Sequence, residues 1–226
     1  MDDLGYANAS PAEEDTSMHA IFRGISIIPV LTIDRERDAV PLARALFEGG
    51  LPVIEITMRT AVAPMAIAAI RRELPQITIG AGTLLRAADV ATAAHAGARF
   101  LVSPGMTPEL AAAALATELP YLPGVATPSE VMATRALGVC VMKFFPAEAL
   151  GGIAWLRALA PVFPGIAFCP TGGIDEGSAA DYLAVPNVPF IGGSWMAPRD
   201  AVAASDWHRV RRLAERAAAI GRREAA

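Results

Sequence analysis

The stretch Pro52-Val53-Ile54-Glu55-Ile56-Thr57, with the segment Ala63–Leu74 behind it, decides the fold. The first is a short apolar run without strict alternation of apolar and polar residues, as is typical of a parallel strand buried on both faces. The second is an Ala- and Ile-rich segment that predicts a helix. Together they form one predicted strand–helix unit, and the same pattern recurs along the chain.

Eight strands are predicted, spaced by roughly 20 to 27 residues, about the length of one such unit. They are Ile27–Ile33, Val53–Thr57, Ile77–Gly82, Phe100–Ser103, Tyr121–Gly124, Val139–Phe144, Ile166–Pro170 and Val188–Gly193. The predicted helices are Asp38–Gly49, Ala63–Leu74, Ala87–Gly97, Pro108–Leu119, Pro128–Gly138, Gly152–Leu159 and Glu176–Ala184. Eight units in one chain predict an α/β fold, a single (β/α)8 TIM barrel.

A doubly wound open sheet is the alternative architecture. It would usually carry a glycine-rich dinucleotide-binding loop after the first strand, and Ile33-Asp34-Arg35-Glu36 has no glycine. Gly80-Ala81-Gly82-Thr83 begins like such a loop, but Leu85 stands where its last glycine belongs. The sequence therefore favours the barrel.

Composition narrows the class of protein. The 226 residues are 54% hydrophobic and carry a net charge of −4, which fits a well-packed domain and argues against a nucleic-acid partner. No run of about 18 apolar residues predicts a membrane span. Cys140 and Cys169 lie in apolar runs, as small buried residues of a reducing, cytoplasmic compartment do. Residues 1–20 lack the regions of a signal peptide and predict a disordered acidic tail before a barrel at 21–226.

Lys143 is the only lysine in a chain with 18 arginines, and it lies in the apolar run Val139–Phe144. Arginine stays protonated under working conditions, whereas a lysine removed from water can become a neutral nucleophile. The chemistry that this suggests is a Schiff base with a substrate carbonyl. The alternative is an accident of composition, with the ammonium group reaching out of the sheet to solvent.

Glu55 is the second unusual charge, because a carboxylate inside a strand is costly unless it is paired or used. It is a candidate general acid–base, or else one partner of a structural ion pair with Arg59 or Lys143. Arg59 offers a bidentate fork to a substrate carboxylate, or else is a solvated loop charge.

Two glycine-rich turns follow the last two predicted strands. They are Thr171-Gly172-Gly173-Ile174 and Gly192-Gly193-Ser194-Trp195. Backbone N–H groups in these two loops of a barrel commonly bind phosphate, although glycine equally suits a plain tight turn. The three histidines show no metal-ligand spacing, so neither a metal nor another cofactor is expected.

Six motifs taken in order resemble the 2-keto-3-deoxy-6-phosphogluconate (KDPG) aldolases. They are Pro52–Thr60, Gly80–Thr83, Val102–Gly105, Lys143–Glu148, Cys169–Ile174 and Gly192–Trp195. The resemblance runs from about Ser26 to Pro198. It implies a metal-free class I aldolase, usually a homotrimer. Such an enzyme cleaves KDPG to pyruvate and D-glyceraldehyde 3-phosphate in the Entner–Doudoroff pathway.

The resemblance also implies a role for each matching residue. Lys143 would form the Schiff base and Glu55 would transfer protons. The pyruvyl end would be held by Arg59 and Thr83 and lined by Pro104 and Phe145, and the phosphate would be bound by Gly172, Gly173 and Ser194, with Thr171 nearby.

Two departures from the family are visible. Met58 replaces a frequent leucine, and Ile28–Thr32 lacks the arginine that some relatives direct at phosphate. Cleavage of 4-hydroxy-2-oxoglutarate to pyruvate and glyoxylate, or of the galactonate epimer of KDPG, therefore remains an alternative activity. A phosphosugar isomerase or epimerase, a pyridoxal-phosphate enzyme and a non-catalytic sugar-phosphate binder are rival classes. An isomerase or epimerase and a sugar-phosphate binder do not need a buried lysine with a carboxylate. A pyridoxal-phosphate enzyme would need its cofactor.

Overall fold

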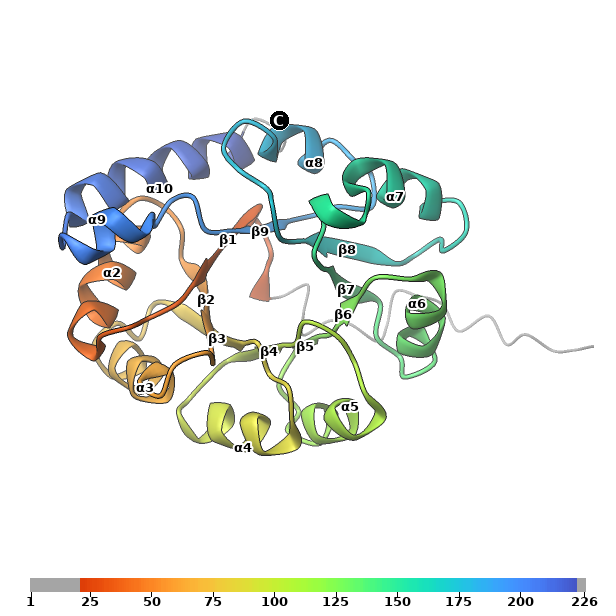
Figure 1. Cartoon of the computed structure of the whole chain (residues 1–226), viewed down its shortest axis with the longest axis horizontal. Helices are drawn as coiled ribbons and strands as arrows, with labels where there is room; N and C mark the ends of the chain where they lie inside the picture. Colours follow the sequence, from red (N-terminus) through yellow and green to blue (C-terminus); the bar gives the residue numbers. More distant parts are fainter. Residues whose placement is uncertain (1–20, 223–226) are drawn as a thin grey trace, which may run out of the picture.

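The computed structural model describes residues 21–222, so the predicted acidic tail at 1–20 lies outside the described residues. The strands lie around the centre of the molecule and the helices lie outside them (Figure 1). The strands are β1 Ile27–Leu31, β2 Val53–Thr57, β3 Thr78–Gly82, β4 Phe100–Val102, β5 Tyr121–Leu122, β6 Gly124–Val125, β7 Val141–Phe144, β8 Ala167–Pro170 and β9 Ile191–Gly193. The helices are α2 Glu36–Glu48, α3 Ala63–Glu73, α4 Ala87–His95, α5 Pro108–Leu115, α6 Pro128–Arg135, the 3-10 turn η1 Glu148–Leu150, α7 Gly152–Leu159, α8 Ala179–Leu183, α9 Arg199–Ala203 and α10 Trp207–Arg222.

All strand pairs are parallel, as the unbroken apolar runs predicted. Six strands form one sheet in the order β5-β4-β3-β2-β1-β9, and β6-β7-β8 form a second. A bridge between Thr171 and Gly192 connects the second sheet to β9. The result is a curled parallel sheet in two parts, which confirms the α/β class without a continuous eight-stranded ladder.

The predicted strand Tyr121–Gly124 explains the break in the ladder. It is divided into β5 and β6 at Pro123, which has no N–H group to donate and so interrupts the ladder. Leu101 and Val102 pair with β5, whereas Lys143 and Phe144 pair with β6. One short segment therefore serves both sheets.

The helices α9 and α10 at the end of the chain lie beyond the seven helices whose bounds the sequence predicted. Helix α10 buries Val210, Ala214 and Ala217, whose spacing of three or four residues marks one helical face. It packs against α2. Ala214 lies so close to Gly49 that a Cβ atom built on Gly49 would be 2.4 Å from the Cβ atom of Ala214. The arginine-rich composition of the segment conceals this narrow apolar face. No helix within residues 21–222 is long and apolar enough to cross a membrane.

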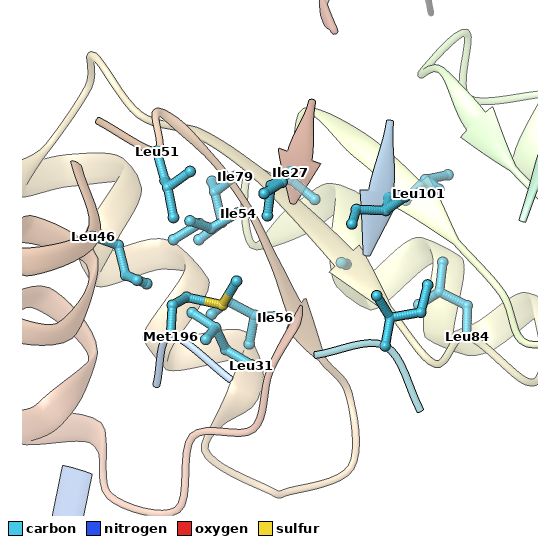
Figure 2. Packing of buried hydrophobic residues seen from close by; sticks show 14 of the residues in the cluster. Ile27, Leu31, Leu46, Leu51, Ile54, Ile56, Ile79, Leu84, Leu101 and Met196 are labelled. Carbon is cyan, nitrogen blue, oxygen red and sulfur yellow. The ribbon is translucent and has the colours of Figure 1, made fainter. Parts of the chain in front are cut away.

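The core has two layers because side chains alternate across each strand. Outward-facing residues such as Ile54, Ile56 and Ile79 pack with Leu46 and Met196 between the strands and the helices (Figure 2). Inward-facing residues form a second cluster that fills the centre of the curled sheet. Its buried members are Phe22, Ile28, Val53, Phe100, Val102, Leu122, Val141, Cys169 and Phe190.

Candidate active site

Glu55 and Lys143 meet in the interior of the curled sheet. Each stands two residues after a member of the inner apolar cluster, Val53 on β2 and Val141 on β7. Residues two apart on a strand point to the same face. The two charged side chains consequently lie inside, where Glu55 is 3% and Lys143 5% exposed.

The two side chains form a buried ion pair. Lys143 Nζ lies 3.2 Å from Glu55 Oε1 and 3.4 Å from Oε2, so the ammonium group donates to both carboxylate oxygens. The partner of Glu55 is thus Lys143 and not Arg59. The idea that Lys143 reaches out to solvent is wrong. An amine and a carboxylate in hydrogen-bond contact can exchange a proton, which is the arrangement that a nucleophilic lysine needs.

Gly82 on β3 makes the space that the Glu55 carboxylate occupies. A Cβ atom built on Gly82 would lie 1.9 Å from Glu55 Oε1. Glycine inside a strand often marks such a close approach. The sequence predicted Gly80–Thr83 as a failed nucleotide motif and as one of the family motifs but assigned no role to Gly82, although an in-strand glycine near a strand carboxylate was a usable signal.

The remaining neighbours of Lys143 are uncharged. Gly124 and Cys169 pair with it in register from β6 and β8, and its Nζ lies 5.6 Å from the centre of the Phe145 ring. Burial raises the pKa of the Cys169 thiol to about 12, and the nearby charge of Lys143 lowers it by less. The thiol therefore stays protonated and does not compete with Lys143 as a nucleophile.

A cavity of about 710 Å³ opens next to the pair. Thr57 and Phe145 line it; they stand two positions after Glu55 and Lys143, at the end of β2 and just beyond the end of β7. Six of the predicted site residues share this lining: Arg59, Phe145, Thr171, Gly172, Gly173 and Ser194. Glu55 and Lys143 lie in the sheet interior and are not among the lining residues.

Two predicted residues, Thr83 and Pro104, are also absent from the cavity lining. Both are partly buried; Thr83 follows the end of β3, the neighbour of the strand that carries Glu55, and Pro104 follows the end of β4, the next strand along the sheet. Thr83 adopts a φ of 59°, a left-handed conformation that is uncommon for a residue other than glycine. The structure thus puts them on the same rim of the sheet without placing them in the cavity wall.

The glycine turn, residues Thr171–Ile174, has backbone conformations that favour glycine. Gly172 and Gly173 have φ angles of 102° and 84°. Ala147 and Glu148 donate backbone hydrogen bonds to the carbonyls of Thr171 and Gly172, at 2.9 and 3.1 Å, and so hold the turn. The N–H groups of Gly173 and Ser194 make no hydrogen bond to any residue from 21 to 222. These donors at the cavity wall are suited to an anion.

The sequence reasoning missed the charged residues that β1 and α9 contribute to the cavity. Asp34, Arg35, Asp38 and Arg199 all line it. Arg35 pairs with Asp38 at 2.6 Å. These residues form no recognisable motif in the sequence. Within the described chain no group of three or more His, Cys, Asp or Glu side chains could hold a metal ion.

Comparison with known proteins places this geometry in one family. Residues 18–213 match the model of the KDPG and KHG aldolases. A 2-dehydro-3-deoxy-phosphogluconate aldolase of Pseudomonas aeruginosa is 48% identical over 91% of this chain and 93% of its own. A KHG/KDPG aldolase of Escherichia coli is 44% identical over 89% and 95%. A KDPG aldolase from Legionella pneumophila, solved with pyruvate as a covalent carbinolamine intermediate, is 44% identical with a TM-score of 0.85, covering 87% and 95%.

Gly82→Ala tests the packing around the ion pair. The added methyl group collides with the Glu55 carboxylate, so we expect the free energy of unfolding to fall by about 1–3 kcal/mol, the usual effect of overpacking. Urea denaturation measures the change. Gly105→Ala is the matched control, because a Cβ there has no atom within 4 Å. Equal stability of the two variants would contradict the close approach of Glu55 to Gly82.

Proposed function

The chain belongs to the KDPG and KHG aldolase family, and we propose that Lys143 and Glu55 are the catalytic pair with which it cleaves KDPG to pyruvate and D-glyceraldehyde 3-phosphate. The enzyme is a class I aldolase, an aldehyde-lyase that catalyses a step of the Entner–Doudoroff pathway. The contact between Lys143 Nζ and the Glu55 carboxylate, buried beside a cavity with free N–H donors, is the observation that carries the proposal.

The pair supports formation of the Schiff base. Transfer of one proton from the Lys143 ammonium to Glu55, across 3.2 Å, leaves a neutral amine that attacks the C2 ketone. The carbinolamine hydroxyl then leaves as water when Glu55 returns the proton. What remains is an iminium cation at C2 and an ionised Glu55 next to it.

The iminium cation drives the cleavage step. Glu55, directly or through a water molecule, accepts the proton of the C4 hydroxyl as the C3–C4 bond breaks. The bonding electrons pass into the iminium group and give an enamine, and the aldehyde leaves. The enamine is then protonated at C3, and water releases pyruvate from Lys143. The cation on nitrogen supplies the charge that a bound metal supplies in class II aldolases.

Two groups of residues hold the ends of the substrate in this proposal. Arg59 and Thr83 bind the pyruvyl carboxylate, and Pro104 and Phe145 line that end. The position of Arg59 at the cavity, with no ion pair to any residue from 21 to 222, supports its role. The distal phosphate lies against Gly172, Gly173 and Ser194, with Thr171 nearby, and the unused N–H groups of this wall support that placement.

The family resemblance extends the proposal to architecture and assembly. We infer that the two parts of the sheet act as one closed (β/α)8 barrel, with β5 and β6 as a single strand interrupted at Pro123. We also infer a homotrimer in the cytoplasm that contains one barrel per chain.

Cleavage of 4-hydroxy-2-oxoglutarate is the second candidate activity. The Escherichia coli relative carries both activities in its name. The glycine turn favours a phosphorylated substrate, because its unused donors would be left without an acceptor by the smaller one. The galactonate epimer differs at a single carbon and would use the same residues.

Borohydride trapping tests the covalent mechanism. We expect pyruvate and borohydride, without any added cofactor, to attach one pyruvyl group per chain, at Lys143. Peptide mass spectrometry locates the adduct. Labelling confined to the N-terminal amine would overturn the assignment of Lys143, and Lys143→Arg, which keeps the positive charge, is the control that should not be labelled.

Glu55→Gln tests the proton-transfer role. The amide keeps the size of the side chain but cannot accept the proton, so we expect kcat for KDPG to fall by a factor on the order of 10²–10⁴. Steady-state kinetics measure the loss, and circular dichroism verifies the fold. A variant with wild-type turnover would leave Glu55 as a structural partner of Lys143 only.

Ser194→Ala tests the phosphate end. The substitution removes the Ser194 hydroxyl and keeps its backbone N–H group. Loss of one hydrogen bond from this hydroxyl to the charged phosphate, worth about 1.5–3 kcal/mol, should lower kcat/KM for KDPG roughly 10- to 100-fold. Cleavage of 4-hydroxy-2-oxoglutarate, which has no phosphate, should change little and serves as the internal control. Equal losses on both substrates would place Ser194 in the structure of the site instead of the phosphate contact.

A further inference from the structure

The proposed phosphate wall lacks a positive charge of its own. Thr171, Gly172, Gly173 and Ser194 offer hydroxyl and N–H donors, all uncharged. A phosphate monoester carries a charge of roughly −1.5 to −2 at neutral pH. We propose that Arg199 supplies the missing cation and thereby sets the preference for a phosphorylated over an unphosphorylated substrate. This inference rests on the proposed function and adds a specificity residue to it.

Three guanidinium groups line the cavity within residues 21–222, those of Arg35, Arg59 and Arg199. Arg35 is already engaged. Its Nε lies 2.6 Å from Asp38, and its Nη2 donates to the carbonyls of Val202 and Ala203 at 3.2 and 3.3 Å. It neutralises a carboxylate and ties the segment after β1 to the end of α9, so it has little capacity left for a ligand.

Arg59 and Arg199 divide the two ends of the substrate between them. Arg59 follows β2, the strand that carries Glu55, and so lies with the reacting end. Arg199 lies five residues after Ser194, at the first position of α9. It is exposed, and it makes no ion pair or side-chain hydrogen bond with any residue from 21 to 222. Its guanidinium group is therefore free to bind an anion in the cavity that it lines.

The segment that joins Ser194 to Arg199 is firmly held. Ala197 donates to the Ser194 carbonyl at 3.0 Å, and Met196 is fully buried. Pro198, with a φ of −64°, comes directly before Arg199 and accepts a hydrogen bond from Val202. The backbone of Arg199 thus keeps a fixed position relative to Ser194, and only its side chain must be ordered by the ligand.

The charges of the cavity wall also support a phosphate-binding role for Arg199. Arg35 and Asp38 cancel each other, and Asp34 adds an exposed carboxylate. With Arg59 at the pyruvyl end, the other charged residues of the lining would sum to −1 without Arg199 and would repel a phosphate. Arg199 offsets Asp34, and its planar fork can contact two phosphate oxygens at once.

Substitution of Arg199 tests the inference through the ratio of two substrates. We expect Arg199→Ala to lower kcat/KM for KDPG roughly 3- to 30-fold, a range that allows for solvent screening of an exposed charge. Its kcat/KM for 4-hydroxy-2-oxoglutarate should stay near that of the wild type. Arg199→Lys should retain part of the preference, since it keeps the charge but loses the fork. Arg157→Ala, which removes an exposed arginine outside the cavity lining, is the matched control.

Three results would overturn the inference: equal losses on both substrates, no loss on either, or the same loss in Arg157→Ala. A binding measurement distinguishes failure of the inference about Arg199 from failure of the proposed function. Calorimetric titration with glycerol 3-phosphate, a stable mimic of the aldehyde product, should give a Kd raised by a similar factor in Arg199→Ala alone. If the wild type forms no pyruvate adduct, the proposed function is wrong, and the titration still decides Arg199. Absence of glycerol 3-phosphate binding to the wild type, or equal binding by the variant, would refute its role.

Discussion

The buried contact between Lys143 and Glu55 is the interaction on which the site depends. Taking two charges out of water costs several kcal/mol per ion, and a well-packed apolar pair is often at least as stable. Stability of the fold is therefore a poor explanation for this pair. Proton exchange between an amine and a carboxylate is a better one, because it requires them to be adjacent and shielded from water. Because Gly82 has no Cβ atom, it leaves the space that the Glu55 carboxylate occupies in this contact.

The alternation of side chains along parallel strands separates stability from chemistry. Outward residues pack against the helices and hold the strands in place, as Ile54 and Ile56 do on either side of Glu55. On two strands, β2 and β7, the inward residues change along the strand from an apolar residue to a charged one and then to the cavity wall. On β2 this order is Val53, Glu55, Thr57, and Val141, Lys143 and Phe145 repeat it on β7 and just beyond. The proposed catalytic pair thus lies between a packed apolar base and the cavity in which we place the substrate.

Much of this arrangement could be predicted from the sequence, because apolar runs without alternation predict parallel strands and a charge inside such a run predicts a buried site. The individual roles came from the family resemblance, since spacing alone left Glu55 with two possible partners. Other features of the fold could not be predicted from the sequence. The break at Pro123 depends on which neighbour each half-strand pairs with, and α10 presents a narrow apolar face in an arginine-rich segment. Arg199 became a candidate only because the fold places it in the lining of the same cavity as Ser194.

The composition of the chain follows the same division of labour. Binding an anion needs a charge that does not titrate, and Arg59 and Arg199 offer such a charge at the cavity wall. Holding two loops together needs several donors in a fixed plane, as Arg35 uses them. Forming an imine needs a cation that can lose its proton, which a guanidinium group cannot do. The single lysine among 18 arginines stands at the one position where the proposed mechanism requires a cation to lose its proton.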